Sequence, residues 1–301
     1  MNMKVDLCGV TLNNPVMTAS GTFGSGAEYA EFVDLNKLGA VVTKGVANVP
    51  WPGNPTPRVA EVYGGMLNAV GLQNPGIDLF VERDIPFLKQ FDTKIMVNVC
   101  GHSTEEYIEV VERLSDQPVD LLEINISCPN VKEGGIAFGQ DPKAVEAITK
   151  EMKKHAAQPV IMKLSPNVTD ITEMARAAEA GGADGLSLIN TITGMKIDIN
   201  RQKFVLANKT GGMSGPAIHP VAVRMVYQTA QAVSIPIVGM GGIMNAEDAI
   251  EMILAGATAV SVGTANFTNP HVTEEIVAGI RDYMERYQVA DIRDLVGAVH
   301  E

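Results

Sequence analysis

The sequence is poor in cysteine, and the cysteine spacing excludes the common cysteine-based sites. Only three of the 301 residues are cysteines, Cys8, Cys100 and Cys128. They form no CxxC pair and no cluster with histidine, so the chain encodes neither a disulfide framework nor a zinc or iron–sulfur site. We expect no metal site, and a reducing cytoplasm as the location.

Long apolar runs and basic clusters are also missing. Nowhere do the ~18 consecutive apolar residues of a membrane-spanning helix occur, and the N-terminus lacks the apolar core of a signal peptide. Lys and Arg number 23 against 35 Asp and Glu, which gives a net charge of −12. Nucleic acids and anionic membranes attract basic surfaces, so we exclude both as main partners.

What the sequence does contain is a regular alternation of short apolar runs and helix-period segments. Helix start signals occur at Ser103, Asp141, Asp170, Asn245 and Asn269. Eight apolar runs are typical of strands buried in a parallel sheet. They span residues 15–20, 40–45, 94–100, 121–127, 159–165, 185–190, 236–241 and 259–264.

This alternation predicts an α/β fold built from right-handed βαβ units, and eight such units predict a (β/α)8 TIM barrel. We expect residues 1–301 to form a single domain. A doubly wound sheet is the alternative, but the GxGxxG that usually follows its first strand is absent. Residues 49–76 show no helix pattern, and Trp51 and Tyr63 among them indicate order rather than disorder. We therefore expect a long loop insertion after strand 2 that covers the C-terminal face.

The C-terminal ends of barrel strands form the active site in this fold, so the residues there are candidates. Two lysines and three asparagines at one mouth would suit an anionic ligand with several hydrogen-bonding edges. The glycines after the last two strands indicate a phosphate site, although they could serve only tight turns. Likewise, the lysines could be surface residues. The strand-end residues are Ser20, Gly21, Lys44, Asn98, Asn125, Cys128, Lys163, Asn190, Thr191, Gly241, Gly242, Gly263 and Thr264.

Cys128 is the best candidate for a general base. None of the five histidines stands at a strand end, so the usual base is missing there. A free thiol has a pKa of about 8.5, which predicts a rate that rises toward alkaline pH. Gly134, Gly135 and Gly139 follow closely and would permit a lid, with a plain loop as the alternative. We expect Cys8 and Cys100 to be structural.

The segments NISCPNVKEGGIAFGQDP, VVTKGV, GGMLNAVGLQNPG and VGMGGI, together with Lys163, resemble class 1 dihydroorotate dehydrogenases over nearly the whole chain. The resemblance implies FMN in a TIM barrel and oxidation of (S)-dihydroorotate to orotate in pyrimidine (UMP) biosynthesis. Cys128 would remove a proton from C5 while hydride passes from C6 to the flavin N5.

The resemblance also assigns binding residues position by position. Those implied to bind the substrate are Lys44, Asn68, Ala69, Val70, Gly71, Leu72, Asn125, Asn190 and Thr191. Those implied to bind the cofactor are Ser20, Gly21, Lys44, Gly45, Asn98, Asn125, Lys163, Ile189, Gly215, Gly241, Gly242, Gly263 and Thr264.

Within class 1, the segments VKEGGIAFGQDP and FVDLNKLGAVVTKGV resemble the B type, which passes electrons to NAD⁺. That type implies a partner subunit that carries FAD and a [2Fe–2S] cluster. The implied assembly is a heterotetramer of two catalytic and two electron-transfer subunits, built on a catalytic homodimer. The cysteine base separates the chain from the membrane-associated class 2 enzymes, which use serine and carry an extra N-terminal segment.

Four alternatives stay open at this point. One is a class 1 A-type enzyme that uses fumarate, and another is an FMN-dependent enzyme of dihydrouracil or dihydrothymine, which would not need Lys44 for a carboxylate. A third is a Schiff-base aldolase that uses Lys163 on a phosphorylated sugar. The last is a barrel that serves only as a binding subunit, without flavin.

Overall fold

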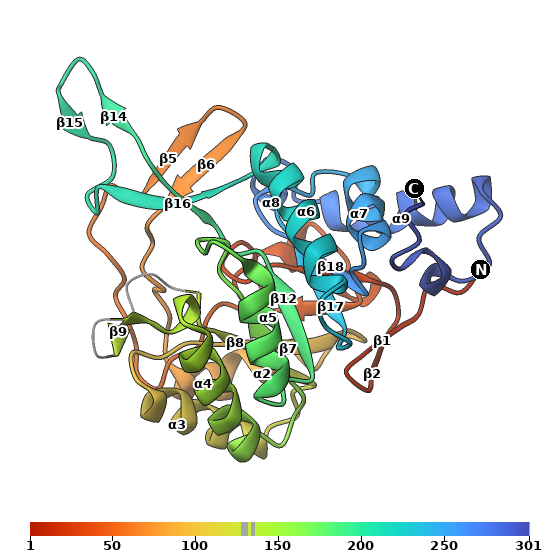
Figure 1. Ribbon diagram of the computed structural model, residues 1–301, viewed down its shortest axis with the longest axis horizontal. Coiled ribbons are helices and arrows are strands. Elements are labelled where there is room, and N and C mark those ends of the chain that lie inside the picture. The colour runs from red at the N-terminus through yellow and green to blue at the C-terminus, as the bar shows by residue number, and fades with distance from the viewer. Residues whose placement is uncertain (128–131, 134–135, 301) are drawn as a thin grey trace.

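The computed structural model describes residues 1–127, 132–133 and 136–300, and its centre is a closed barrel of parallel strands (Figure 1). Neighbours round the barrel follow chain order, and the last strand pairs with the first through Val260 and Val16. Each strand lies within one of the predicted runs, so the TIM-barrel prediction is confirmed. The strands are β3 (Val16–Thr18), β4 (Ala40–Val42), β7 (Lys94–Val99), β8 (Leu121–Asn125), β11 (Val160–Lys163), β12 (Gly185–Leu188), β17 (Ile237–Met240) and β18 (Ala259–Val262).

Helices surround the barrel and bury the outer faces of its strands (Figure 1). In α3, the buried residues Tyr107, Val110, Val111 and Leu114 repeat at helix period, so one face packs inward. The long helices are α3 (Thr104–Ser115), α4 (Pro142–His155), α5 (Ile171–Ala180), α6 (His219–Ala230), α7 (Ala246–Leu254) and α9 (Val272–Arg286). The short ones are α1 (Ile77–Leu79), the π-helical turn Phe80–Asp84, α2 (Ile85–Leu88) and α8 (Ala265–Thr268).

Side-chain caps begin four of the helices where the sequence predicts them. The capping residues of α3, α4, α5 and α7 each accept a first-turn N–H, and they are Ser103, Asp141, Asp170 and Asn245. The fifth start signal is displaced: His271 is the N-cap of α9, and the side chain of Asn269 accepts the N–H of His271 instead.

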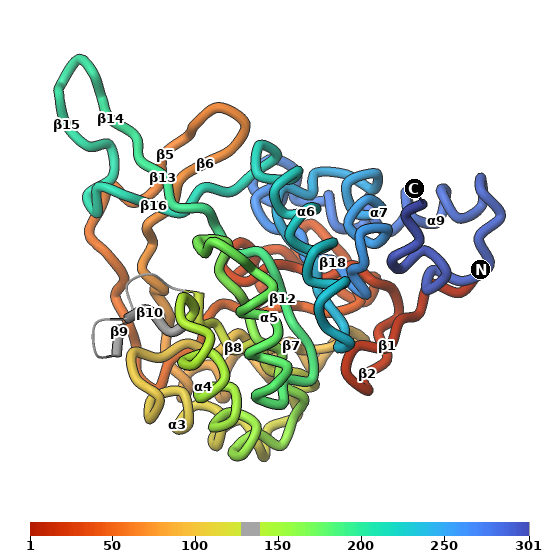
Figure 2. The backbone as a smooth tube through the Cα atoms, in the orientation of Figure 1, coloured from red at the N-terminus to blue at the C-terminus, as the bar shows by residue number. Residues whose placement is uncertain are grey.

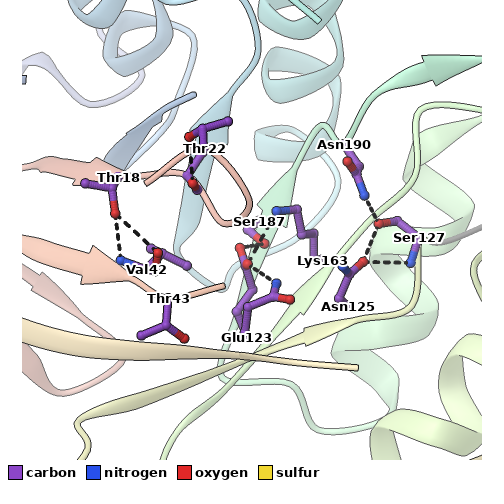
Figure 3. A network of polar contacts seen from close by, with 12 residues as sticks. Thr18, Thr22, Val42, Thr43, Glu123, Asn125, Ser127, Lys163, Ser187 and Asn190 are labelled. Carbon is purple, nitrogen blue, oxygen red and sulfur yellow. Dashed lines mark hydrogen bonds and ion pairs between the residues drawn. The ribbon is translucent and has the colours of Figure 1, made fainter. Parts of the chain in front are cut away.

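The join between β3 and β4 relies on a side chain because the backbone pairing there is short. The paired register is Met17 with Ala40. The hydroxyl of Thr18 accepts the N–H of Val42 at 2.9 Å and lies 3.3 Å from the Val42 carbonyl, to which it donates (Figure 3). Thr18 is fully buried, so both hydrogen-bonding functions of its hydroxyl need such partners.

The hairpin of β1 (Val5–Leu7) and β2 (Val10–Leu12) lies at the N-terminal end of the barrel. Its turn residue Cys8 occupies the space beside the first residue of β12, since a Cβ on Gly185 would lie 2.7 Å from the Cys8 sulfur. Burial, reinforced by the carboxylates of Asp184 and Asp6, raises the pKa of Cys8 to about 12. A thiol of that pKa stays protonated near neutral pH, which fits a structural residue.

Two excursions at the other end of the barrel form a second, antiparallel sheet (Figure 2). The hairpin of β5 (Val59–Val62) and β6 (Gly65–Asn68) lies within residues 49–76. It pairs with β16 (Thr210–Ser214), which pairs in turn with β13 (Ile192–Met195). A further hairpin, β14 (Ile197–Asp198) with β15 (Lys203–Phe204), projects from this sheet (Figure 1).

The expectation of a wholly irregular segment over residues 49–76 is therefore wrong in part. Strands of four residues joined by Tyr63 and Gly64 carry too little alternation to stand out in a sequence. Elsewhere, β9 (Lys132–Glu133) pairs with β10 (Ile136–Ala137). The N-terminal segment contacts the segment after α9, where the Asn2 N–H donates to the Ala290 carbonyl at 2.8 Å (Figure 1). Among the described residues, no helix has the length and apolar character needed to cross a bilayer.

Candidate active site

A cavity of about 470 Å³ opens at the C-terminal ends of the barrel strands. Its floor comes from the strand ends, and one wall comes from β6, β13 and β16 of the second sheet. This volume lies within the range of about 300–1,000 Å³ that is typical of small-molecule sites. The two long excursions thus deepen what would otherwise be an open barrel mouth.

Most residues that the sequence assigns to a site line this one cavity. The lining ones are Ser20, Gly21, Lys44, Asn68, Ala69, Val70, Gly71, Leu72, Asn125, Lys163, Ile189, Asn190, Thr191, Gly241, Gly242, Gly263 and Thr264. Three assigned residues, Gly45, Asn98 and Gly215, do not line it. Cys128, the assigned base, lies outside the described residues, as do Gly134 and Gly135 of the expected lid.

Lys44 and the segment 68–72 approach the cavity from adjoining walls. Lys44 follows β4 and is half-buried, and a Cβ on Gly21 would lie 3.7 Å from its Nζ. The turn at Gly71 is held by Asn54, whose side-chain amide donates to the Ala69 carbonyl at 3.0 Å. Gly71 has φ +76°, and a Cβ there would lie 2.6 Å from Asn54, so only glycine suits this close approach.

A chain of hydrogen bonds fixes the end of β8. The side-chain carbonyl of Asn125 accepts the hydroxyl of Ser127 at 2.6 Å, and the Asn190 amide donates to the same Ser127 hydroxyl (Figure 3). The backbone carbonyl of Asn125 accepts the hydroxyl of Tyr107 at 2.6 Å. Two cavity-lining amides, Asn125 at the end of β8 and Asn190 after β12, are therefore held in fixed orientations through the same Ser127 hydroxyl.

The loops after β17 and β18 form a tight backbone cradle. Gly241 has φ +128°, and a Cβ there would lie 2.7 Å from that of Ala222. His219 supports this loop from behind, with its Nδ1 2.9 Å from the Gly241 carbonyl. Gly263, in contrast, has room for a Cβ at ordinary contact distance. An exposed backbone beside the start of a helix is the usual way to bind a phosphate.

A buried ion pair that the sequence did not predict runs from the cavity floor, at Lys163, into the barrel interior, at Glu123. Lys163 is 4% exposed and its Nζ lies 3.4 Å from Oε2 of Glu123, which is 1% exposed (Figure 3). Oε1 of Glu123 accepts the hydroxyl of Ser187 at 2.8 Å, and Oε2 accepts the Asn98 amide at 2.5 Å. Asn98 thus lies beneath the cavity rather than on its surface. Apolar residues dominate most barrel interiors, so this polar cluster stands out.

Other lining residues also escaped the sequence reasoning, because no motif marks them. Asn167 accepts the Thr193 N–H at 2.9 Å and donates to the Thr191 carbonyl at 3.0 Å, so it orders the start of the second excursion. The Thr264 hydroxyl donates to that of Ser214 at 2.7 Å and joins the loop after β18 to β16. The sequence does hold one indication for Asn167, because it lies only four residues after Lys163, at the end of a predicted strand.

Comparison with known proteins decides the family. The profile of the family described as dihydroorotate dehydrogenase matches residues 2–284. The chain belongs to the dihydroorotate dehydrogenase family. It is similar to a protein of Lachnoclostridium phytofermentans named dihydroorotate dehydrogenase B (NAD(+)), catalytic subunit, at 72% identity over 99% of this chain and 100% of the relative. Proteins of the same name from Alkaliphilus metalliredigens and Caldicellulosiruptor bescii are 65% and 53% identical, over 99% and 100% of this chain and 99% and 100% of those proteins.

Dihydroorotate dehydrogenases are flavin enzymes, and the cavity suits a flavin. A cation at the floor, amides on the walls and a glycine cradle at one end match an anionic, planar cofactor with a phosphate tail. The hydroxyl of Ser261, which lines the cavity, is buried without a hydrogen-bond partner in the described part of the chain. A buried orphan hydroxyl of this kind is satisfied when a polar ligand occupies the site.

Proposed function

We propose that this chain oxidises (S)-dihydroorotate to orotate in pyrimidine biosynthesis, with FMN as its cofactor. The observation that carries the proposal is the convergence of Lys44, the 68–72 segment and the glycine cradle on one cavity. Full-length similarity to the B-type catalytic subunits supports it. We also propose that the whole chain forms one catalytic domain.

The residues around the cavity divide into two groups by the chemistry they offer. Lys163, Ser20 and Gly21 would hold the flavin ring system, while Gly241, Gly242, Gly263 and Thr264 would hold its phosphate. Lys44 would bind the substrate carboxylate, because an ammonium is the natural partner for that charge. Asn68, Asn125 and Asn190 would bind the amide edges of the pyrimidine, which need both donors and acceptors.

Bound FMN would supply the hydride acceptor, which no amino-acid side chain offers. Cys128 would take the proton from C5 of dihydroorotate, as its place after β8 and the family resemblance indicate. The Asn125–Ser127–Asn190 chain would orient the substrate so that C5 faces the thiol. The second sheet would shield the reacting atoms from water, since its strands form a wall of the cavity.

The alternatives are less well supported. An enzyme of dihydrouracil would leave Lys44 without a carboxylate to bind. A Schiff-base aldolase needs a lysine amine that is free to attack a carbonyl, whereas Lys163 is buried with its Nζ 3.4 Å from the carboxylate of Glu123. A binding barrel without flavin would not need the glycine cradle. The A-type enzyme is disfavoured because the curated relatives carry the B-type name.

We also propose a partner for the chain. The relatives are named catalytic subunits, which implies a second subunit in those proteins. This chain would pass electrons to NAD⁺ through a subunit that carries FAD and a [2Fe–2S] cluster. The two would form a heterotetramer built on a catalytic homodimer. The described residues hold no cluster of cysteines that could bind iron and sulfur here. The cytoplasmic location stays a prediction.

The test is a substrate panel with the purified chain, FMN and a two-electron dye as acceptor. We expect dye reduction with dihydroorotate and, at equal concentration, at least tenfold slower reduction with dihydrouracil. The reverse preference, or equal rates, would contradict the proposal. Fumarate as the acceptor provides the control for the A type, and we expect it to support no turnover.

A further inference from the structure

The ion pair beneath the cavity is the strongest feature that the proposed function leaves unexplained. Glu123 and Asn125 lie two residues apart on β8, so both side chains point to the same, inner side of the barrel. Asn125 lines the cavity, and Glu123 lies one layer deeper. Lys163 pairs with Asn125 in the strand register and reaches across to Glu123.

The neighbours of Glu123 show that its carboxyl group serves as an acceptor. The Asn98 amide, the Ser187 hydroxyl and the Lys163 ammonium all direct donors at it, and they come from three different strands, β7, β12 and β11. An ionised carboxylate has only acceptors, so this donor set suits the charged form. A buried charge pair is costly to desolvate, and the barrel could be filled with apolar side chains instead.

Lys163 has donors left for a ligand. Among the described residues its one hydrogen-bond partner is Glu123, although an ammonium has three N–H groups, and the side chain lines the cavity. Resting on the proposed function, we infer that Glu123 is a positioning residue: it holds the Lys163 ammonium at the cavity floor and offsets its charge beneath the flavin. The flavin ring system would therefore lie near an ammonium whose charge is largely balanced by the Glu123 carboxylate, rather than near an unbalanced positive charge.

The charge at this position controls how readily the flavin accepts electrons. Reduction adds negative charge to the ring system, so a nearby cation raises the midpoint potential and a nearby anion lowers it. Glu123→Gln removes the anion and keeps the shape. One amide oxygen can still accept from Asn98 and Lys163, and the amide nitrogen can donate to Ser187, whose hydroxyl also accepts.

The first test is the FMN midpoint potential of the reconstituted protein, measured by equilibration with a reference dye and without substrate. We expect the potential to rise in Glu123→Gln and to fall in Lys163→Gln. Ser187→Ala is the matched control, because it removes a hydrogen bond to the same carboxyl group without changing any charge. An unchanged potential in Glu123→Gln, or an equal shift in Ser187→Ala, would overturn the inference.

The double variant Glu123→Gln/Lys163→Gln keeps the inference testable if the single Glu123 variant does not fold. It should have a higher potential than Lys163→Gln alone, since that single variant leaves the anion uncompensated. Equal potentials in the two would overturn the inference. Where both single variants do fold, the flavin-free double variant should unfold at a higher temperature than their separate shifts predict together. Additive unfolding temperatures would likewise overturn it. A wild-type chain that binds no FMN would contradict the proposed function instead.

Discussion

The hydroxyl of Tyr107 donates a 2.6 Å hydrogen bond to the backbone carbonyl of Asn125. Tyr107 lies on α3 and is 1% exposed, while Asn125 ends β8 and lines the cavity. A buried phenol needs a partner, and this one ties the outer helix layer to a strand end at the site. This hydrogen bond thus connects the packing of α3 to the position of a residue that lines the cavity.

Tyr107→Phe should therefore affect both stability and binding. It leaves the Asn125 carbonyl without this donor, and we expect a loss of about 1–2 kcal/mol in the free energy of unfolding. Orotate affinity should fall several-fold because the Asn125 amide loses its fixed orientation. Thermal unfolding and orotate titration measure the two effects. Tyr227→Phe, at an exposed site on α6, is the control and should change neither. Wild-type affinity in Tyr107→Phe would show that the bond does not position Asn125.

The glycine cradle allows a matched pair of variants. Gly241→Ala introduces a clash with Ala222 at a positive φ, so it should destabilise the flavin-free protein itself by more than about 1 kcal/mol. Gly263→Ala has room for its methyl group and should leave thermal unfolding of that protein unchanged. Yet it should weaken FMN binding about tenfold, or about 1.4 kcal/mol, by blocking close approach of the phosphate. Unaltered FMN affinity in Gly263→Ala would argue against a phosphate there.

Lys44→Ala should weaken orotate binding by about 10- to 100-fold, as expected for a lost charge-assisted hydrogen bond of about 1.5–3 kcal/mol. Affinity for uracil, which has no carboxylate, should stay the same in this variant. Lys89→Ala changes an exposed lysine that does not line the cavity and serves as the control. If orotate and uracil lose affinity equally, Lys44 does not recognise the carboxylate.

Thiol labelling separates the three cysteines. With a pKa of about 12, Cys8 is thiolate in only about one molecule in ten thousand at pH 8, and Cys100 is fully buried. We expect iodoacetamide at pH 8 to label one site, Cys128, and orotate to protect it. Raising the pH to 9 should not bring Cys8 into reaction, because its pKa is still far above that value. Cys8→Ala is the control and should take up the same amount of label. Peptide mapping that places label on Cys8 would contradict this account.

The barrel could be predicted because each strand is a short apolar run closed by polar or glycine residues. Burial on both faces makes such runs continuous, and the strand ends then bring distant residues such as Lys44 and Lys163 to one mouth. The second sheet could not be predicted. Its joining contact, between Asn68 and Gly212, spans 144 residues, and pairing over such a separation leaves no local pattern.

Glu123 escaped prediction for a related reason. In a strand buried on both faces, the letters LLEIN do not tell which residues point into the barrel. Its partners lie 25, 40 and 64 residues away on other strands. Only the assembled barrel brings Asn98, Lys163 and Ser187 to one carboxylate.

We expect this chain alone to carry out the oxidation of dihydroorotate. The decisive experiment is to mix the purified, FMN-loaded chain with dihydroorotate without oxygen and to follow visible flavin absorbance. We predict rapid bleaching with one orotate formed per flavin, and strongly slowed bleaching at neutral pH in Cys128→Ser, since a hydroxyl is a far weaker acid than a thiol. A wild-type protein that binds FMN and stays yellow with dihydroorotate would contradict the account.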